Sequence, residues 1–231
     1  MEQKLRVERR VGRAKVVSFD LDGTVTDISF VNSVWLEGIP RLYALKNGLS
    51  FEDAKNFVTG EYGKVGRERL EWYSLGYWMA KLGLNASPEE VLNVYQNKIR
   101  VYPDVIEVLQ EFRIRGLRLI IVSNARREFA DLELEKTGIG HYFERVFSST
   151  SDFGLIKKTV SLYRKVCSLC GVSPDEMVHV GDDECFDFEV PNNLGITAFY
   201  LDRTGQHSGD HIVHGLQELS GKLARCNHSV Q

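Results

Sequence analysis

The sequence predicts an α/β fold, with a Rossmann-like parallel sheet core, helices on both faces and a small all-helical cap domain. Short apolar runs alternate with helix-like segments along most of the 231 residues, as in proteins built around a parallel sheet. Residues 28–99 are the exception, because they follow the first apolar run and hold no clear strand. That stretch is too long for one crossover helix, which indicates an inserted helical unit.

Short apolar runs mark the expected strands, because strands covered on both faces read as continuous apolar stretches. These runs span residues 16–19, 117–122, 145–148, 177–180 and 196–201. Three segments between them read as helices, each closely followed by a glycine that is typical of a helix end. The predicted helices span residues 104–115, 126–137 and 157–169.

The inserted stretch has apolar residues at helical spacing, for example Leu70, Tyr73, Tyr77 and Leu82. We therefore expect a core domain formed by residues 1–26 and 103–231, and a helical cap domain formed by residues 27–102. The cap would lie over the carboxyl end of the first strand, where open α/β sheets bind their ligands.

Two features of the cap bear on specificity. Residues 59–67 are rich in glycine and predict a loop, either an ordinary interhelical connection or a mobile one that brings Lys64 or Arg67 to the substrate. A nearby aromatic cluster is more typical of a cap core than of a ligand-stacking site. That cluster contains Trp72, Tyr73, Tyr77 and Trp78.

The overall composition limits the partners. Hydrophobic residues make up 43% and charged residues 26% of the chain, as in ordinary globular proteins. A net charge of −3 provides no positive field for a polyanion, so we expect no nucleic-acid partner. No run reaches the roughly 18 apolar residues of a membrane span, and residues 1–15 lack the apolar run of a secretory signal. We expect a cytoplasmic protein without a membrane partner.

Four cysteines are too few to indicate a disulfide framework: Cys167, Cys170, Cys185 and Cys226. Cys167 and Cys170 form one C-x-x-C pair late in a predicted helix, and no second pair completes a zinc site. Two small apolar side chains near a helix end are the favoured interpretation, and a redox pair is the alternative.

The end of the first strand holds the first candidate chemistry. Side chains alternate along a strand, so Asp20 and Asp22 point to the same side. Two neighbouring carboxylates repel each other unless a cation or a proton lies between them. Mg²⁺ prefers oxygen ligands of this kind. Gly23 permits the turn that follows, and Thr24 completes the motif.

Other predicted strands end in polar residues as well. Ser123 and Asn124 close the second strand, where a hydroxyl and an amide can donate to an anion or simply cap a helix. Lys157 and Lys158 precede a predicted helix, and one of them could neutralise a phosphate.

Three further acids follow the fourth apolar run: Asp182 and Asp183 come directly after its glycine, and Asp187 comes shortly afterwards. The carboxyl ends of parallel strands share one sheet edge, so these acids should meet Asp20 and Asp22 there. Such a gathering of carboxylates predicts a bound cation. The histidine in this run, His179, is more typical of a core residue than of a ligand.

In these positions the chain resembles the haloacid dehalogenase-like superfamily, in particular phosphatases with a helical cap inserted after the first motif. Residues 20–24 match the family's first motif, which is highly specific. Ser123 matches the second motif, Lys157 the third, and Asp182 and Asp187 the fourth. The resemblance covers nearly the whole chain, from residue 16 to about residue 219.

The third and fourth motifs depart from the family pattern. Relatives often have Lys-Pro where this chain has Lys157 and Lys158, and the alignment favours Lys157 while leaving Lys158 open. Relatives often have Asp-Ser where this chain has Asp182 and Asp183, which leaves the identity of the metal-binding acid open.

The resemblance implies a magnesium-dependent phosphomonoester hydrolase with an aspartyl-phosphate intermediate. Asp20 would attack phosphorus and Asp22 would serve as general acid and base. Asp20, the carbonyl of Asp22 and Asp182 would hold Mg²⁺. Asp187 and Asp183 would orient these ligands without binding the metal themselves. The groups expected at the phosphate oxygens are Lys157, Ser123, Asn124, Gly23 and Thr24.

Asp22 separates this chain from the dehalogenases of the superfamily, which lack a second acid there because a halide leaves without a proton. The expected substrate is a small phosphorylated metabolite. Two alternatives stay open: a phosphomutase of the same fold, and a binding or regulatory protein that retains the fold without turnover. The sequence is also compatible with either a monomer or a homodimer.

Overall fold

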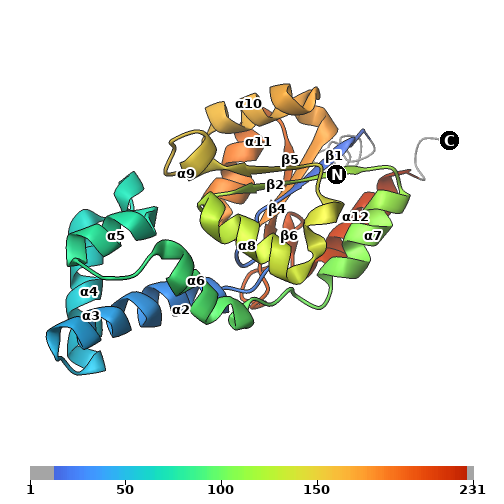
Figure 1. Cartoon of the computed structure of the whole chain (residues 1–231). Coiled ribbons are helices and arrows are strands. Elements are labelled where there is room, and N and C mark those ends of the chain that lie inside the picture. Colours follow the sequence, from blue (N-terminus) through green and yellow to red (C-terminus); the bar gives the residue numbers. More distant parts are fainter. Residues whose placement is uncertain (1–12, 228–231) are drawn as a thin grey trace.

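The structure is a computed structural model that describes residues 13–227. Most of the polar N-terminal segment, in which the sequence predicts no secretory signal, lies outside the described residues. Two lobes are visible in Figure 1: a larger one built on a sheet, and a smaller, wholly helical one. Within the described residues, no helix is both long and apolar enough to cross a membrane.

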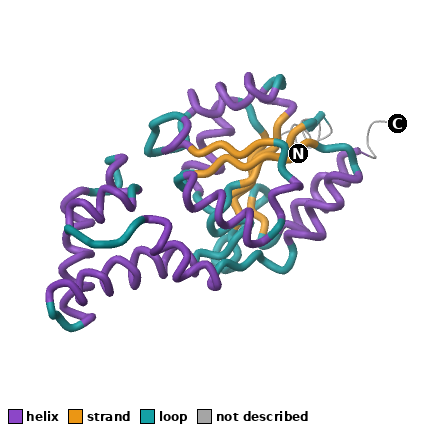
Figure 2. The backbone as a smooth tube through the Cα atoms, viewed as in Figure 1, coloured by secondary structure: helices purple, strands orange, loops and turns teal. Residues whose placement is uncertain are grey.

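A six-stranded parallel sheet forms the centre of the larger lobe (Figure 2). Its strands lie in the order β3-β2-β1-β4-β5-β6. They are β1 (Val16–Phe19), β2 (Arg118–Ser123), β3 (Arg145–Ser148), β4 (Met177–Gly181), β5 (Thr197–Leu201) and β6 (Ile212–Val213). The predicted strands are confirmed to within one residue, whereas β6 was not predicted, because two residues make no recognisable apolar run.

Helices cover both faces of the sheet (Figure 1). One face packs against α7 (Val105–Ile114), α8 (Arg127–Thr137) and α12 (Leu216–Asn227). The other packs against α10 (Val160–Cys170) and α11 (Val190–Leu194). Val17 and Phe19 point to the first face and Val16 points to the second. The alternating side chains of β1 therefore pack into two separate hydrophobic cores. The predicted fold class is therefore confirmed.

One helix boundary differs from the prediction in a way that matters for the site. The helix expected over residues 157–169 begins only at Val160, because Thr159 is its N-cap and its hydroxyl accepts a hydrogen bond from the Leu162 amide at 3.2 Å. Lys157 and Lys158 therefore lie in the preceding loop. Gly171 ends the helix in a left-handed conformation, with φ of 66°.

The smaller lobe is helical throughout. Its helices are α2 (Ser29–Ser33), α3 (Ile39–Asn47), α4 (Phe51–Val65), α5 (Leu75–Leu82) and α6 (Pro88–Tyr95), and a π-helical turn (Val34–Gly38) joins the first two. A hydrophobic cluster of its own fills this lobe, and Phe129 of α8 is the buried core residue that joins the cluster. We propose residues 27–102 as the cap domain, and residues 1–26 with 103–231 as the core domain.

Three of the four aromatic residues predicted to form a cap core serve its packing, whereas Tyr73 lies outside that cluster and donates its hydroxyl to the carbonyls of Arg67 and Ile156. Trp78 is fully buried, and Trp72 and Tyr77 pack against the same cluster. Residues 59–65, expected to form a loop, are instead the last turns of α4. Lys64 pairs there with Glu61 at 2.5 Å, so its ammonium is engaged within the cap. Glycine lowers helix propensity without forbidding a helix, and burial of the apolar face of α4 outweighs it here.

Two short chain segments join the lobes. Thr26 and Val101 form an antiparallel bridge, and the Asp27 amide donates to the Arg100 carbonyl at 2.9 Å. The Tyr102 amide donates to the Val25 carbonyl at 3.1 Å. The first crossing comes soon after the end of β1, and the second crossing pairs with the first. The cap is therefore anchored directly beside the motif that begins at residue 20.

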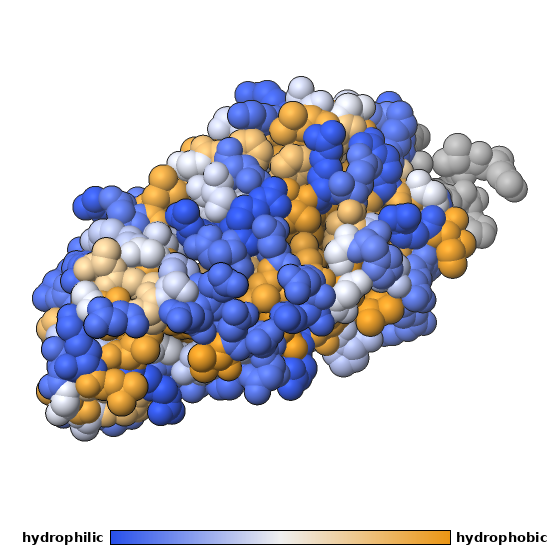
Figure 3. Space-filling model, viewed as in Figure 1, coloured by the Kyte–Doolittle hydropathy of each residue, from blue (hydrophilic) through white to orange (hydrophobic). Residues whose placement is uncertain are grey.

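The surface is mostly polar in the view of Figure 3. Exposed apolar side chains gather where α3 leads into α4: Leu45, Leu49 and Phe57. The cysteines Cys167 and Cys170 are buried with free thiols, and the Cys167 sulfur lies 3.9 Å from that of Met177. The favoured interpretation of this pair as small apolar core residues is consistent with that packing.

Helix α7 provides a test of the core. Leu109 is fully buried, whereas Ile106 on the same helix is 45% exposed. Leu109→Ala removes core contacts and leaves a cavity, so we expect it to lower the free energy of unfolding by about 2–5 kcal/mol. The matched variant Ile106→Ala should change it by no more than about 0.5 kcal/mol. Urea denaturation monitored by circular dichroism measures both, and equal losses would contradict this account of the core.

Candidate active site

The predicted site residues converge at the carboxyl edge of the sheet. Asp20 follows β1, Asp182 follows β4, and Ser123 ends β2, and these three strands are neighbours in the sheet. A pocket of about 180 Å³ opens there. It is lined by Asp20, Asp22, Ser123, Asn124, Ala125, Lys158, Asp182, Asp183, Phe186 and Asp187.

Glycines allow the acidic loops to meet. Gly23 has φ of 82°, and a Cβ atom added to it would lie 2.2 Å from Oδ2 of Asp182. A Cβ atom on Gly181 would lie 2.3 Å from the carboxyl carbon of Asp187. Any side chain at these two positions would occupy the space of an acidic group, so both turns require glycine.

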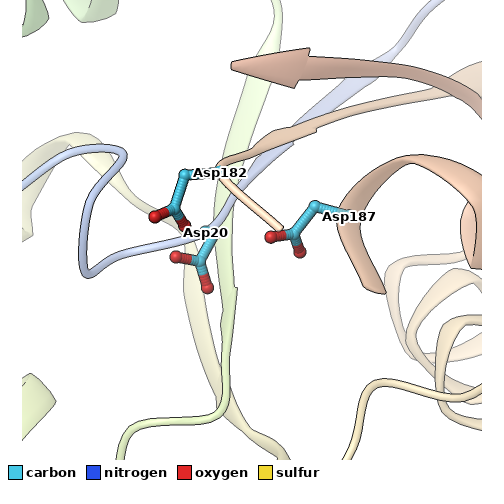
Figure 4. Close-up of side chains that lie close together, drawn as sticks. All are labelled: Asp20, Asp182 and Asp187. Carbon is cyan, nitrogen blue, oxygen red and sulfur yellow. The ribbon is translucent and has the colours of Figure 1, made fainter. Parts of the chain in front are cut away.

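Three carboxylates form the centre of the pocket. One oxygen from each of Asp20, Asp182 and Asp187 lies within 4.8 Å of the others. Figure 4 shows Asp20 beside Asp182, with Asp187 facing them from the neighbouring turn. The loop after β4 thus contributes Asp182 to this cluster. Asp183 instead accepts a hydrogen bond from the Phe186 amide at 2.8 Å and caps the following π-helical turn.

Lys158 is the lysine of the site. Its side chain is 2% exposed, and its ammonium pairs with Asp20 and, at 2.5 Å, with Asp187. The two carboxylates hold the pKa of Lys158 above its ordinary value, although burial acts in the opposite direction. The group is therefore a buried, permanently charged cation beside Asp20.

The prediction that Lys157 is the catalytic lysine is not supported. Lys157 lies 2.8 Å from Glu68 of the cap, and its side chain is 41% exposed. The two lysines are consecutive in a loop, and their side chains lie in different places. Lys158 lines the pocket, whereas Lys157 pairs with the cap.

Asp187 is held by a buried network. Its Oδ1 lies 3.0 Å from His179 Nε2, and its Oδ2 accepts from the Asp183 amide at 3.1 Å. Burial raises the pKa of Asp187, but Lys158 and His179 together lower it below its ordinary value. Asp187 is therefore an anion whose main contacts are to protein groups.

His179 belongs to the same network rather than to a binding surface. Its Nδ1 lies 2.9 Å from the Ser18 hydroxyl and its Nε2 2.9 Å from the Tyr163 hydroxyl. Burial lowers the pKa of His179, although the Asp187 carboxylate acts in the opposite direction. Its interpretation as a satisfied core residue is consistent with these contacts, and they also show that it supports Asp187.

A buried glutamate lies behind Asp22 and was not predicted. Glu133 of α8 is fully buried and accepts a hydrogen bond from the Thr26 hydroxyl at 2.5 Å. Burial and the neighbouring Asp22 raise the pKa of Glu133 well above its ordinary value. The sequence did contain a signal, because Glu133 shares the buried stripe of α8 with Phe129 and Ala130.

Two of the predicted phosphate-binding residues line the pocket and two do not. Ser123 is 2% exposed, and Asn124 accepts a hydrogen bond at Oδ1 from Ser149 at 2.5 Å. The amides of Gly23 and Thr24, by contrast, donate within their own turn, to Thr26 at 2.7 Å and to Leu21 at 3.2 Å. The backbone amides of Gly23 and Thr24 therefore shape the turn, whereas the buried Thr24 hydroxyl has no hydrogen-bond partner among the described residues.

The electrostatics of the cluster suit a cation. Burial raises the pKa of Asp20 well above its ordinary value, and Asp187 and Asp182 add to this despite the opposing effect of Lys158. Loss of hydration and the Asp187 charge raise the pKa of Asp182 to about 7. One lysine thus does not neutralise the acids, and the oxygen-only donor set suits a hard divalent ion.

A larger hollow of about 540 Å³ lies along the sheet edge at β3. Its walls include Arg127, Phe147 and Phe153. None of the predicted site residues borders it, so the smaller acidic pocket is the candidate active site.

Comparisons with known proteins agree with this geometry. The model of the haloacid dehalogenase-like hydrolase family matches residues 14–189. A GMP/IMP nucleotidase of Escherichia coli is 28% identical over 193 residues, which cover 78% of this chain and 82% of the relative. A glyceraldehyde 3-phosphate phosphatase of Methanocaldococcus jannaschii is 26% identical over 219 residues, which cover 89% of this chain and 95% of the relative.

A solved structure shows the same likeness. The HAD phosphatase from Thermococcus onnurineus superposes with a TM-score of 0.80 at 29% identity, covering 90% of this chain and 97% of that one. The match to the family model spans the chain segments that carry the acidic pocket. The chain therefore belongs to the haloacid dehalogenase-like hydrolases, among the phosphatases of that family.

Proposed function

We propose that this protein hydrolyses small phosphomonoesters, with Mg²⁺ as cofactor and a phosphorylated Asp20 as intermediate. The observation that carries the proposal is the pairing of buried Asp20 with Lys158 in a pocket that also holds Asp22 and Asp182. A nucleophilic carboxylate, a second acid and a local cation are the groups that phosphoryl transfer to an aspartate requires.

In the first step, an oxygen of Asp20 attacks phosphorus, and the bond from phosphorus to the leaving oxygen breaks. Asp22 gives that oxygen its proton. Burial raises the pKa of Asp22 to about 6, so at neutral pH this carboxyl can be protonated and deprotonated readily. In the second step, Asp22 takes a proton from water, and the water oxygen attacks phosphorus and releases Asp20.

Lys158 and the donors of the β2 loop would bind the phosphate. Lys158 reduces the repulsion between the Asp20 anion and an anionic substrate. Because Oδ1 of Asn124 accepts from Ser149, the amide nitrogen of Asn124 remains as a donor beside Ser123. Asp187 would act through Lys158, which it holds at 2.5 Å.

Asp20 and Asp182, with the backbone carbonyl of Asp22, are the groups that would hold Mg²⁺. When bound, Mg²⁺ supplies positive charge at the transferring phosphoryl group. Asp183 would act only by shaping the loop that presents Asp182, since its carboxylate caps the next turn.

The substrate class follows from the relatives and from the pocket. One relative is a nucleotidase of GMP and IMP, and another is a glyceraldehyde 3-phosphate phosphatase. GMP, IMP and glyceraldehyde 3-phosphate are all small phosphorylated metabolites, and a pocket of about 180 Å³ is consistent with binding the phosphoryl end of such a molecule. The phosphomutase and the non-catalytic alternatives are distinguished by the following test.

Phosphate release from GMP, glyceraldehyde 3-phosphate and p-nitrophenyl phosphate tests the function. We expect release with Mg²⁺, none with excess EDTA, and none from the Asp20→Asn variant, because an amide is not a nucleophile. Asp22→Asn should slow turnover by about 10²–10⁴-fold.

Release that survives in Asp20→Asn would refute the mechanism. Conversion of a sugar phosphate to its isomer without free phosphate would indicate a mutase. Mg²⁺ binding by a folded protein that releases no phosphate from any ester would indicate a binding protein.

The two lysines permit a matched comparison. Lys158→Met should lower kcat by at least about 10²-fold, because it leaves Asp20 without its buried cation. Lys157→Met removes only a partly exposed ion pair with Glu68, so its kcat should stay close to that of the unmodified protein. Steady-state phosphate release measures both variants. The opposite ranking would restore Lys157 as the catalytic lysine.

Thermal unfolding of Asp182→Asn tests the metal site. The pKa of Asp182 is about 7 in the folded protein, against about 3.9 in an unfolded chain. The folded state therefore holds the extra proton, and stability falls as the pH rises from about 4 through 7. In EDTA, we expect the Tm advantage of Asp182→Asn to grow over that range.

Magnesium should raise the Tm of the unmodified protein above pH 7, and that of Asp182→Asn much less, because the variant lacks one ligand. An equal rise in both proteins would remove Asp182 from the metal site.

A further inference from the structure

An arginine outside the pocket connects the turn after Asp22 to the hinge of the cap. Arg203 follows β5, and its side chain is 17% exposed. Three groups from different parts of the chain surround its guanidinium: the carbonyl of Thr24, the carboxylate of Asp104 and the ring of Tyr102.

The contacts are close and use separate parts of the guanidinium. Nη2 donates to the Thr24 carbonyl at 2.8 Å, and Nη1 lies 3.2 Å from the carboxylate of Asp104. The guanidinium carbon lies 3.8 Å from the centre of the Tyr102 ring. A planar group with several fixed donors can make these contacts together, which a lysine ammonium cannot.

The partners of Arg203 are themselves fixed to the core. Asp104 precedes α7, and its Oδ2 accepts a hydrogen bond from the Leu216 amide at the start of α12, at 2.7 Å. Tyr102 is the residue at which the chain re-enters the core, and its amide donates to Val25 at 3.1 Å. Arg203 therefore joins the turn of residues 22–26, the returning hinge segment and two core helices.

The turn depends on such support. Oδ1 of Asp22 is buried. Two features fix the direction of the Asp22 carboxyl: the neighbouring Glu133 carboxyl, which forms a hydrogen bond with it, and the backbone of the turn, two residues from the Thr24 carbonyl that Arg203 holds. The same turn forms the bridge from Thr26 to Val101, through which any movement of the cap reaches it.

We propose that Arg203 is a positioning residue that holds Asp22 in place for proton transfer and couples its turn to the cap hinge. This inference rests on the proposed function, in which Asp22 is the general acid and base. A small displacement of a reacting group can lower a rate by about 10²-fold without weakening ground-state binding.

The test compares Arg203→Ala with a matched variant, Arg118→Ala. Arg118 has a similar set of contacts far from the pocket, where β2 begins. Its guanidinium lies 2.6 and 2.8 Å from the oxygens of Glu144 and donates to the Cys170 carbonyl at 2.8 Å. Both variants therefore lose one ion pair and one bond to a carbonyl, but only one of them loosens the turn after Asp22.

With p-nitrophenyl phosphate and Mg²⁺, Arg203→Ala should lose about 10²-fold in kcat with little change in KM. Free guanidinium at low millimolar concentration should restore part of that loss. Arg118→Ala should keep its kcat at a similar cost in Tm. If Arg203→Ala does not fold, Arg203→Lys replaces it, with a smaller loss of kcat expected.

An unchanged kcat, or a loss that Arg118→Ala shares, would overturn the inference. Amide hydrogen exchange provides a readout that does not depend on turnover. Faster exchange over residues 22–27 and 100–105 is expected in Arg203→Ala and not in Arg118→Ala, and equal rates would also overturn the coupling. Failure of the proposed function would appear differently, as absence of phosphate release from the unmodified protein.

Discussion

The structure depends on one buried ion pair network, in which Lys158 lies between Asp20 and Asp187. Two chain segments bring carboxylates to one edge of the sheet, and burial there would otherwise leave them unpaired. A buried charge is costly unless it is paired and hydrogen-bonded. Lys158 supplies the opposite charge, and the contacts of Asp187 to His179 and the Asp183 amide satisfy the remaining acceptor sites. Removal of one partner would leave a buried charge without compensation, which is strongly destabilising.

The network also explains why the pKa values of the acids are shifted in different directions. Asp187 is engaged by protein groups, and its pKa is lowered. Asp20 and Asp182 are not fully neutralised, and their pKa values are raised. Asp20 and Asp182 thus present incompletely neutralised carboxylates at the place where, in the proposed mechanism, a metal ion and a phosphate would meet. Similar acids at one sheet edge thus have different roles, and the difference comes from their hydrogen-bond partners.

The position of the cap follows from the same strand end. Both crossings between the lobes are bridged at Thr26 and Val101, directly after the turn that carries Asp22. Across the pocket, Glu68 of the cap meets Lys157, and the Tyr73 hydroxyl lies 3.5 Å from the Ile156 carbonyl. The cap thus contacts the loop that delivers Lys158. Lys157, although absent from the pocket, links that loop to the cap.

The sequence by itself determined the fold class, the strands and most of the acidic site. Strand alternation and the motif of residues 20–24 are local properties, so Asp20, Asp22 and Asp182 could be identified without coordinates. Only the tertiary structure decided between Lys157 and Lys158, because both lie in a loop whose path sets which side chain is buried. The internal bonds of Gly23 and Thr24 and the burial of Glu133 beside Asp22 likewise depend on contacts between distant segments. Local patterns record the chemistry that a residue can supply, whereas packing decides which neighbour it reaches.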